Sequence, residues 1–249
     1  MLINAIIGAL IIGLCLSIFG SGGSILTIPV LLYLVGMQPE LAIASSLLIV
    51  GIISLFNGSL LIRHRQVSWP HVLLFGFPGM VGTYLGAWLA LQIDSRVQLA
   101  VFTVLMLLSA ILMWRSKPKP TQQPVQHLKL MLDGIVVGVV TGFVGVGGGF
   151  LIVPALVLMG GLPLSIAVGS SLLIISINAA SGFYKYYSVM AAAGVQFDWQ
   201  IIAIMAGGGV VGGLAGRYIN QFINKDKLQK AFAIFLVMMA GVVLVKSVL

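Results

Sequence analysis

The chain has 249 residues, of which 60% are hydrophobic and only 7% are charged, and its formal net charge is +8. A soluble globular domain carries about 25% charged residues, so thirteen basic and five acidic side chains cannot cover a water-soluble particle of this length. These numbers exclude a soluble enzyme, a secreted domain and a nucleic-acid-binding protein, and the single cysteine excludes a disulfide framework or a thiolate metal cluster.

The first half of the chain contains one interrupted and three continuous apolar runs. A helix that spans a bilayer needs about 20 mostly apolar residues, because lipid offers no hydrogen-bond partner to a free backbone amide. Residues 2–36 would form a helix roughly 52 Å long, but Gly20-Ser21-Gly22-Gly23 interrupts them. We predict a helical hairpin or a broken helix there, followed by spanning helices over 40–62, 70–92 and 97–114.

A basic segment separates this half from the next. Residues 115–130 contain Pro118, Pro120 and Pro124 and are predicted to form a cytoplasmic linker at the membrane surface, between a first repeat at 1–114 and a second repeat at 131–249. In the second repeat, Gly145-Val146-Gly147-Gly148-Gly149 interrupts the apolar run 132–161. We again predict a hairpin or a broken helix, followed by spanning helices over 164–185, 199–217 and 228–248.

The two halves repeat each other. A shift of 125 residues places Gly20, Gly22, Gly23, Pro29, Ser45 and Ser46 on Gly145, Gly147, Gly148, Pro154, Ser170 and Ser171. A shift of 130 then places Gln66, Trp69, Gly79, Gly82 and Gly86 on Gln196, Trp199, Gly209, Gly212 and Gly216. Leucine matches arise by chance in an apolar chain, but these residue types in a fixed order do not. The chain is therefore an internal duplication, which is a common construction among transporters.

The basic residues predict how the two halves are oriented in the membrane. If each glycine break forms a hairpin, ten of the thirteen basic residues lie on the side of the central linker, and only Arg96, Lys185 and Lys246 lie opposite. If each broken segment instead crosses once, the split falls to eight and five. Because basic residues concentrate on the cytoplasmic side, we predict hairpins, both chain ends outside, and two halves of opposite orientation.

The paired glycine breaks carry the clearest indication of function. Glycine in a membrane helix is often only a packing residue, and that interpretation suits Gly82, Gly86, Gly212 and Gly216. Three glycines within one helical turn cost roughly 3 kcal/mol of helix propensity, so the breaks indicate unwound backbone. Unwound backbone is tolerated at membrane depth only where it is buried or lines a cavity. A short helix starts after each break, and two helix N-termini approaching from opposite faces would bind an anion.

The predicted substrate-binding residues are the two breaks and two serine pairs. Serine in a membrane helix usually bonds back to its own helix, but these pairs occupy the same repeat position, so their hydroxyls are predicted to complete the coordination of a small oxyanion. Asn57, Asn178, Thr27 and Cys15 are secondary candidates, although Cys15 also suits a small apolar filler. The full set is Gly20, Ser21, Gly22, Gly23, Ser24, Ser45, Ser46, Gly145, Gly147, Gly148, Gly149, Ser170 and Ser171.

Catalytic and metal-binding residues are not evident in the sequence. His64, His71 and His127 lie in or beside predicted loops without sharing a face, so neither a metal nor a cofactor is expected. Asp133 is predicted at a helix start, where a carboxylate is favoured. The glycine clusters lack the Lys-Ser/Thr that follows a phosphate-binding loop. Since no acid–base or nucleophile set is present, we predict that the chain is not an enzyme.

A polar-glycine cluster, then Pro-x-Leu and Ala-x-x-Ser-Ser-Leu, each occurring twice, resembles the sulfite exporter TauE/SafE family over essentially the whole chain. The motifs here are Gly20-Ser-Gly-Gly with Pro29-Val-Leu31, Gly145-Val-Gly-Gly-Gly with Pro154-Ala-Leu156, and the later Val67-Ser-Trp69 and Phe197-Asp-Trp199. The resemblance implies a multi-pass permease of the prokaryotic cell membrane that handles sulfur-containing anions. Ser21 and Ser24 stand where the second repeat has Val146 and Gly149, so the first cluster is the more polar one.

Together these observations predict an all-α integral membrane fold of two inverted repeats, each a glycine-broken helical hairpin followed by three transmembrane helices. The predicted function is a secondary transporter of small sulfur-containing anions, such as sulfite, thiosulfate or organosulfonates, in the prokaryotic inner membrane. The alternatives are a passive anion channel and a non-transporting membrane assembly or regulatory protein. The expected partners are the small anionic substrate and the lipid bilayer, with no nucleic acid; a homodimer is left open.

Overall fold

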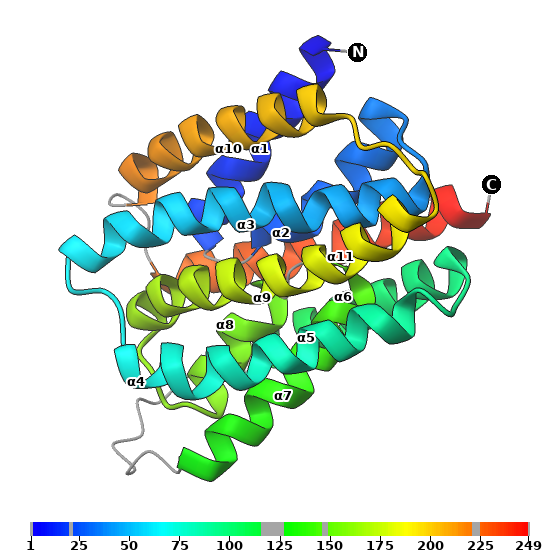
Figure 1. Ribbon diagram of the computed structural model, residues 1–249. Coiled ribbons are helices and arrows are strands. Elements are labelled where there is room, and N and C mark those ends of the chain that lie inside the picture. The colour runs from blue at the N-terminus through cyan, green and yellow to red at the C-terminus, as the bar shows by residue number, and fades with distance from the viewer. Residues whose placement is uncertain (1, 20–21, 116–126, 146–148, 221–224, 249) are drawn as a thin grey trace.

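The computed structural model describes residues 2–19, 22–115, 127–145, 149–220 and 225–248, and these residues form helices joined by short turns (Figure 1). The first half contains α1 (Leu2–Phe19), α2 (Gly22–Pro29) continued by the π-helical segment η1 (Val30–Val35), α3 (Pro39–Arg63), the continuous helix α4–η2–α5 (Trp69–His71, Val72–Gly76 and Phe77–Ala90), and α6 (Ser95–Arg115). The second half contains α7 (His127–Val144), α8 (Gly149–Leu158), α9 (Leu164–Ala192), α10 (Trp199–Asn220) and α11 (Lys225–Val248).

Seven helices of the described residues are long and apolar enough to cross a membrane: α1, α3, α4–η2–α5, α6, α7, α9 and α10. The six continuous spans predicted from the sequence are all helices, and the helix α9 continues past the predicted end at 185 to Ala192. Its Lys185 lies 5.3 Å from the ring centre of Tyr84, so the charge has a favourable aromatic partner and does not end the helix.

The helix α7 begins earlier than its apolar run predicts. It starts at His127, inside the predicted linker, and Asp133 is therefore well within the helix instead of at its start, so that prediction was wrong. The side-chain oxygen Oδ2 of Asp133 is buried and has no hydrogen-bond partner among the described residues. The first turn of α7 contains His127 and Lys129 and therefore lies outside the apolar run from which the span was predicted.

Both π-helical segments lie within two residues of a proline, Pro29 for η1 and Pro70 and Pro78 for η2. Proline has no backbone N–H and removes one helical hydrogen bond, and a π-helical turn is one way for a helix to shift its bonding register. Pro29 directly precedes η1, which ends where the N–H groups of Gly36 and Met37 both reach the carbonyl of Leu31. Gly36 there has φ of 81°, which glycine adopts without steric cost. The short arm of the first hairpin thus ends sharply before α3.

The first broken segment folds back on itself. Gly23 at the start of α2 lies against the backbone of Ile12 and Leu16 in α1, and Gly8 near the start of α1 lies against Val30. These contacts pair the start of one helix with the end of the other, so α1 and α2 run antiparallel. In the second half, α7 and α8 also contact each other. The first broken segment therefore forms a helical hairpin, which is one of the two arrangements that the sequence allowed.

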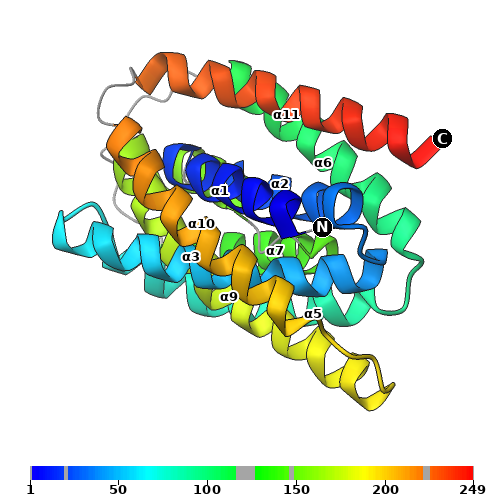
Figure 2. The same ribbon diagram turned by 90° about the horizontal axis from the view of Figure 1, so that it is seen from above.

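The helices α3 and α9 form the centre of the molecule. In their most apolar 18-residue stretches 72% and 61% of residues are buried, against 33% in α6 and α7. They run antiparallel, because Gly51 lies against Ala179 while Gly58 lies against Leu172. Around them α1 packs along α10 and α5 packs along α7, while α6 and α11 form an outer pair (Figure 2).

The spaced glycines of α5 and α10 are packing residues, as the sequence indicates. A β-carbon at Gly82 would collide with the carbonyl of Ile135 in α7, and one at Gly212 would collide with the carbonyl of Leu10 in α1. Gly86 and Gly216 make the matching contacts with Val139 and Leu14. The shifts of 125 and 130 residues place the contacts of α1 with α10 on the contacts of α7 with α5. The two halves therefore pack against each other in corresponding ways.

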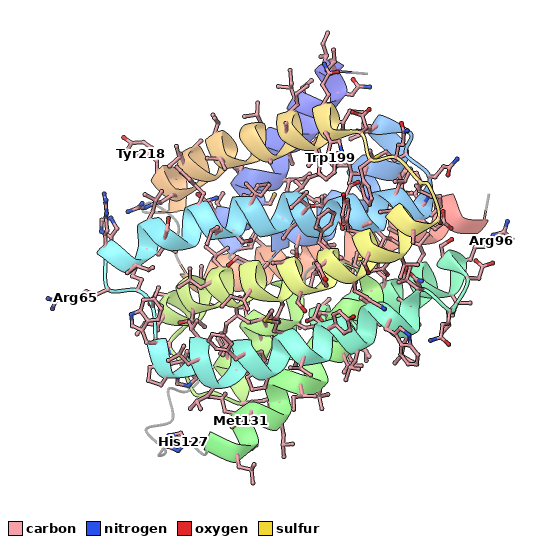
Figure 3. The ribbon with its side chains drawn as sticks, in the orientation of Figure 1. Arg65, Arg96, His127, Met131, Trp199 and Tyr218 are labelled. Atoms are coloured by element: carbon pink, nitrogen blue, oxygen red, sulfur yellow. The ribbon has the colours of Figure 1, made fainter. Side chains whose placement is uncertain are left out.

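The turns lie at two opposite ends of the helix bundle. The turn 64–68, which carries Arg65, lies at one end, and the turns 91–94 and 193–198 lie at the other, near Arg96 and the C-terminus (Figures 1 and 3). Trp69, Trp88, Trp114 and Trp199 stand near helix ends and are between 47% and 57% exposed. Half-exposed tryptophans near helix ends are typical of the two membrane interfaces.

Candidate functional site

The two short helices that follow the glycine breaks meet inside the molecule. The helix α2 begins at Gly22 and α8 begins at Gly149, and the two helices contact each other. The first residues of α2 are enclosed, since Ser24 is fully buried. Of the predicted site residues, Gly20, Ser21, Gly147 and Gly148 lie outside the described residues.

Gly23 has a packing role in addition to any role in binding. Its contact with Ile12 and Leu16 leaves no room for a side chain between α2 and α1. Further along α2, the hydroxyl of Thr27 donates to the carbonyl of Gly23 at 3.3 Å, which is an ordinary bond within one helix. The geometry around Gly23 thus explains why glycine occurs here without reference to a ligand.

Ser46 connects the first half of the chain to the break in the second half. Its hydroxyl lies 2.7 Å from the carbonyl oxygen of Gly145 and 2.8 Å from that of Ile43, and it shares its one hydrogen between them. Gly145 has φ of 74°, and a β-carbon there would collide with the side chain of Ile43. The break therefore requires glycine at 145 and is fixed to α3 by Ser46.

The hydrogen bonds of Ser170 and Ser171 do not reach the described part of either break. Ser170 accepts a hydrogen bond at 2.8 Å from the N–H of Ser68, in the turn between α3 and α4. Ser171 donates at 2.8 Å to the carbonyl of Val168 in its own helix. Ser45 is fully buried, and its hydroxyl has no partner among the described residues. Two adjacent serines on a helix point about 100° apart. The two hydroxyls of each pair therefore face different neighbours.

His71 is a buried polar residue whose role the sequence did not reveal. It is 4% exposed, and its Nε2 donates to the carbonyl of Gly160, 3.2 Å away, in the turn after α8. Since a carbonyl only accepts, the hydrogen is on Nε2, and Nδ1 accepts from the hydroxyl of Ser68 at 2.8 Å. Through Ser68 and Ser170, this histidine links turns of both halves at one end of the bundle. The available signal was its position inside the predicted span 70–92.

Several buried polar groups on the central helices have no partner among the described residues. On α3 these are the hydroxyls of Ser45 and Ser54 and both amide atoms of Asn57, and on α9 both amide atoms of Asn178. Polar side chains inside a membrane protein mark ion or substrate pathways. Among the same described residues, no group of three or more His, Cys, Asp or Glu could hold a metal ion.

Comparison with known proteins gives a consistent result over the full length of the chain. The family model described as sulfite exporter TauE/SafE matches residues 5–243, which confirms the resemblance seen in the motifs. A probable membrane transporter protein of Xylella fastidiosa (strain Temecula1) is 32% identical, over 95% of this chain and 92% of its own length. The probable membrane transporter protein YunE of Bacillus subtilis is 26% identical, with 92% of both chains covered. A probable membrane transporter protein of Methanocaldococcus jannaschii is 26% identical, over 90% of this chain and 88% of its own.

Proposed function

The chain belongs to the sulfite exporter TauE/SafE family, and from that membership we propose that it is a secondary transporter of small sulfur-containing anions, such as sulfite, thiosulfate or organosulfonates. The family and the seven apolar helices make it a multi-pass membrane protein of a transporter family. The prokaryotic inner membrane is its proposed location, since the relatives named above are proteins of bacteria and of an archaeon.

The contact between the half-helices α2 and α8 is the observation that supports this substrate class most directly. The first turn of a helix leaves backbone N–H groups without partners in the helix and carries about half a positive charge. Two such helices can hold an anion without a lysine or arginine in the site. A site of this kind suits a transporter, because the anion must also be released.

The proposed architecture is an inverted repeat. The matching glycine contacts of α5 with α7 and of α10 with α1 support two halves of equivalent fold. The turns after the third helix of each half, 64–68 and 193–198, lie at opposite ends of the bundle (Figure 1), as halves of opposite orientation require. In this arrangement the two half-helices enter from opposite faces of the membrane, and their N-termini face the substrate near the midplane.

Flux into proteoliposomes tests the proposal. Purified protein is reconstituted, and uptake of sulfite, thiosulfate and a short alkanesulfonate is measured beside chloride and phosphate, with empty liposomes as the control. We expect uptake of at least one sulfur-containing anion well above that of chloride. Absence of uptake for every anion would contradict a transport function and favour a structural role.

A second measurement separates a secondary transporter from a passive channel, which is the main alternative. A transporter accumulates its substrate against a concentration difference when a driving ion gradient is imposed, whereas a channel only dissipates that difference. Uptake that never exceeds equilibration, under proton and sodium gradients of either direction, would support the channel.

A further inference from the structure

Two asparagines lie on opposite sides of the central helix pair and have no hydrogen-bond partners among the described residues. Asn57 on α3 is 3% exposed and Asn178 on α9 is not exposed at all. In each side chain both Nδ2 and Oδ1 are buried without a partner. A carboxamide removed from water without compensating hydrogen bonds is strongly disfavoured, so each is expected to find a polar partner in some state of the protein.

Each amide lies against a glycine of the opposite half of the chain, at a point where three helices meet. A β-carbon at Gly213 in α10 would collide with the amide of Asn57, and Gly213 also lies against Gly13 in α1. A β-carbon at Gly79 in α5 would lie 3.0 Å from Nδ2 of Asn178 and 3.2 Å from the carbonyl oxygen of Gly134 in α7. Because Gly213 and Gly79 have no side chain, the two amides can lie close to the backbone at these positions.

The repeat shows that packing alone does not require these amides. The shifts of 125 and 130 residues place the contact of Asn178 with Gly79 on the contact of Ile53 with Gly209, where an apolar side chain fills the same space. They place the contact of Asn57 with Gly213 on that of Gly182 with Thr83. The hydroxyl of Thr83 is satisfied by the carbonyl of Gly79 at 2.8 Å. In both comparisons the fold makes the equivalent contact without an unpaired polar group.

We propose that Asn57 and Asn178 bind the transported oxyanion directly, each through its Nδ2 hydrogens, at successive or alternative positions along the path on the two sides of the α3–α9 pair. This inference deepens the proposed function and rests on it. A neutral amide donor suits an anion that has lost its water, because it supplies hydrogen bonds without the strong attraction of a buried cation. The acceptor atom of the same side chain, Oδ1, can accept from a protonated oxyanion such as hydrogen sulfite.

The test uses leucine, which has the same branched arrangement of four side-chain heavy atoms as asparagine but no hydrogen-bonding group. The variants Asn57→Leu and Asn178→Leu are purified at full length, and sulfite uptake into proteoliposomes and the rise in melting temperature caused by sodium sulfite are measured. We expect each variant to melt at the wild-type temperature or above it, because an unpaired buried amide is removed. Uptake should fall at least about tenfold, and the sulfite-induced rise should disappear, because one binding group is lost.

Ser176→Ala is the matched control, because the hydroxyl of Ser176 is already bonded to the carbonyl of Leu173 in its own helix at 2.7 Å. It should transport sulfite like the wild type. If a leucine variant is unstable, Asn57→Ala and Asn178→Ile replace it, the latter copying Ile53. Stable variants with wild-type uptake would overturn this proposal while leaving the proposed function intact. A wild-type protein that transports no sulfur-containing anion would overturn both.

Discussion

The hydroxyl of Ser46 on α3 donates to the carbonyl oxygen of Gly145, 2.7 Å away and 99 residues later in the chain. This bond joins the central helix of the first half to the glycine break of the second half, directly after α7. A carbonyl at a helix end has no partner in its own helix, and lipid supplies none. Ser46 therefore supplies a hydrogen-bond donor to the carbonyl of Gly145, and it holds the break in place relative to α3.

Replacement of this serine tests its role. Ser46→Ala is expected to weaken sulfite binding by about 1–2 kcal/mol, because the carbonyl of Gly145 loses its donor and the break is held less firmly. Ser171→Ala, at the repeat-equivalent position, is expected to weaken binding less, because the hydroxyl of Ser171 donates to the carbonyl of Val168 in its own helix. Binding is measured by titration of the purified variants. Ser59→Ala, which removes an exposed hydroxyl bonded within α3, is the control. Unchanged affinity in both variants would identify Ser46 and Ser171 as ordinary helix serines.

The close contacts between helices predict which glycines determine stability. Gly212→Ala should lower the free energy of unfolding by about 1–3 kcal/mol, because its new methyl group meets the backbone of α1 at Leu10. Gly207→Ala, in the same helix, meets nothing within 4 Å and should gain up to about 1 kcal/mol from better helix propensity. Melting temperatures in detergent compare the two. Equal melting temperatures would show that α1 and α10 do not pack this closely in the purified protein.

The helices could be predicted from the sequence because the membrane constrains their length and composition. Residues 40–62 are predicted as a span and α3 covers Pro39–Arg63, since lipid requires an uninterrupted run of apolar residues with all backbone groups paired. The start of α7 could not be predicted in this way, because its first turn contains His127 and Lys129 and is not part of the apolar run. The prediction that Asp133 stands at a helix start is wrong for this reason.

The candidate site was only partly predictable. The repeat identified Ser45, Ser46, Ser170 and Ser171 as equivalent positions, but not their partners, because the bond of Ser170 with Ser68 spans 102 residues. A periodic hydrophobic pattern predicts which face of a helix is buried, but it does not predict which other helix packs against that face. The role of His71 could not be predicted for a related reason: its partners, Ser68 and Gly160, are both in turns, and the hydrophobic pattern of a sequence does not give turn geometry.

The charge distribution predicts which end of the bundle faces the cytoplasm. In a Cys15→Ala background, Arg96→Cys should react with a membrane-impermeant maleimide on intact cells, and Arg65→Cys should react only after permeabilisation. Both residues are exposed and lie at opposite ends of the bundle (Figure 3). Cys15, the single native cysteine, is buried in α1, so its removal leaves both labelled positions undisturbed. Labelling of Arg65→Cys from outside would reverse the proposed orientation.

The last prediction concerns Gly145, where backbone conformation and packing can be separated. Gly145→Ala should fail for two reasons: its φ of 74° costs an L-residue about 1–2 kcal/mol, and its methyl group collides with Ile43. The double variant Gly145→Ala/Ile43→Ala removes the collision but not the strain. We therefore expect sulfite uptake to be lost in the single variant and partly restored in the double variant, with Ile43→Ala alone close to wild type.

Gly145→Asn completes the comparison, because asparagine tolerates this region of backbone conformation better than alanine. Combined with Ile43→Ala, it should restore more uptake than the alanine double variant, since less strain remains while the carbonyl can still accept from Ser46. Uptake by each variant is normalised to the amount of monodisperse protein, so that misfolding is not counted as loss of transport. Wild-type uptake by Gly145→Ala alone would show that the break tolerates other conformations, and that the position of the second half-helix does not depend on this glycine.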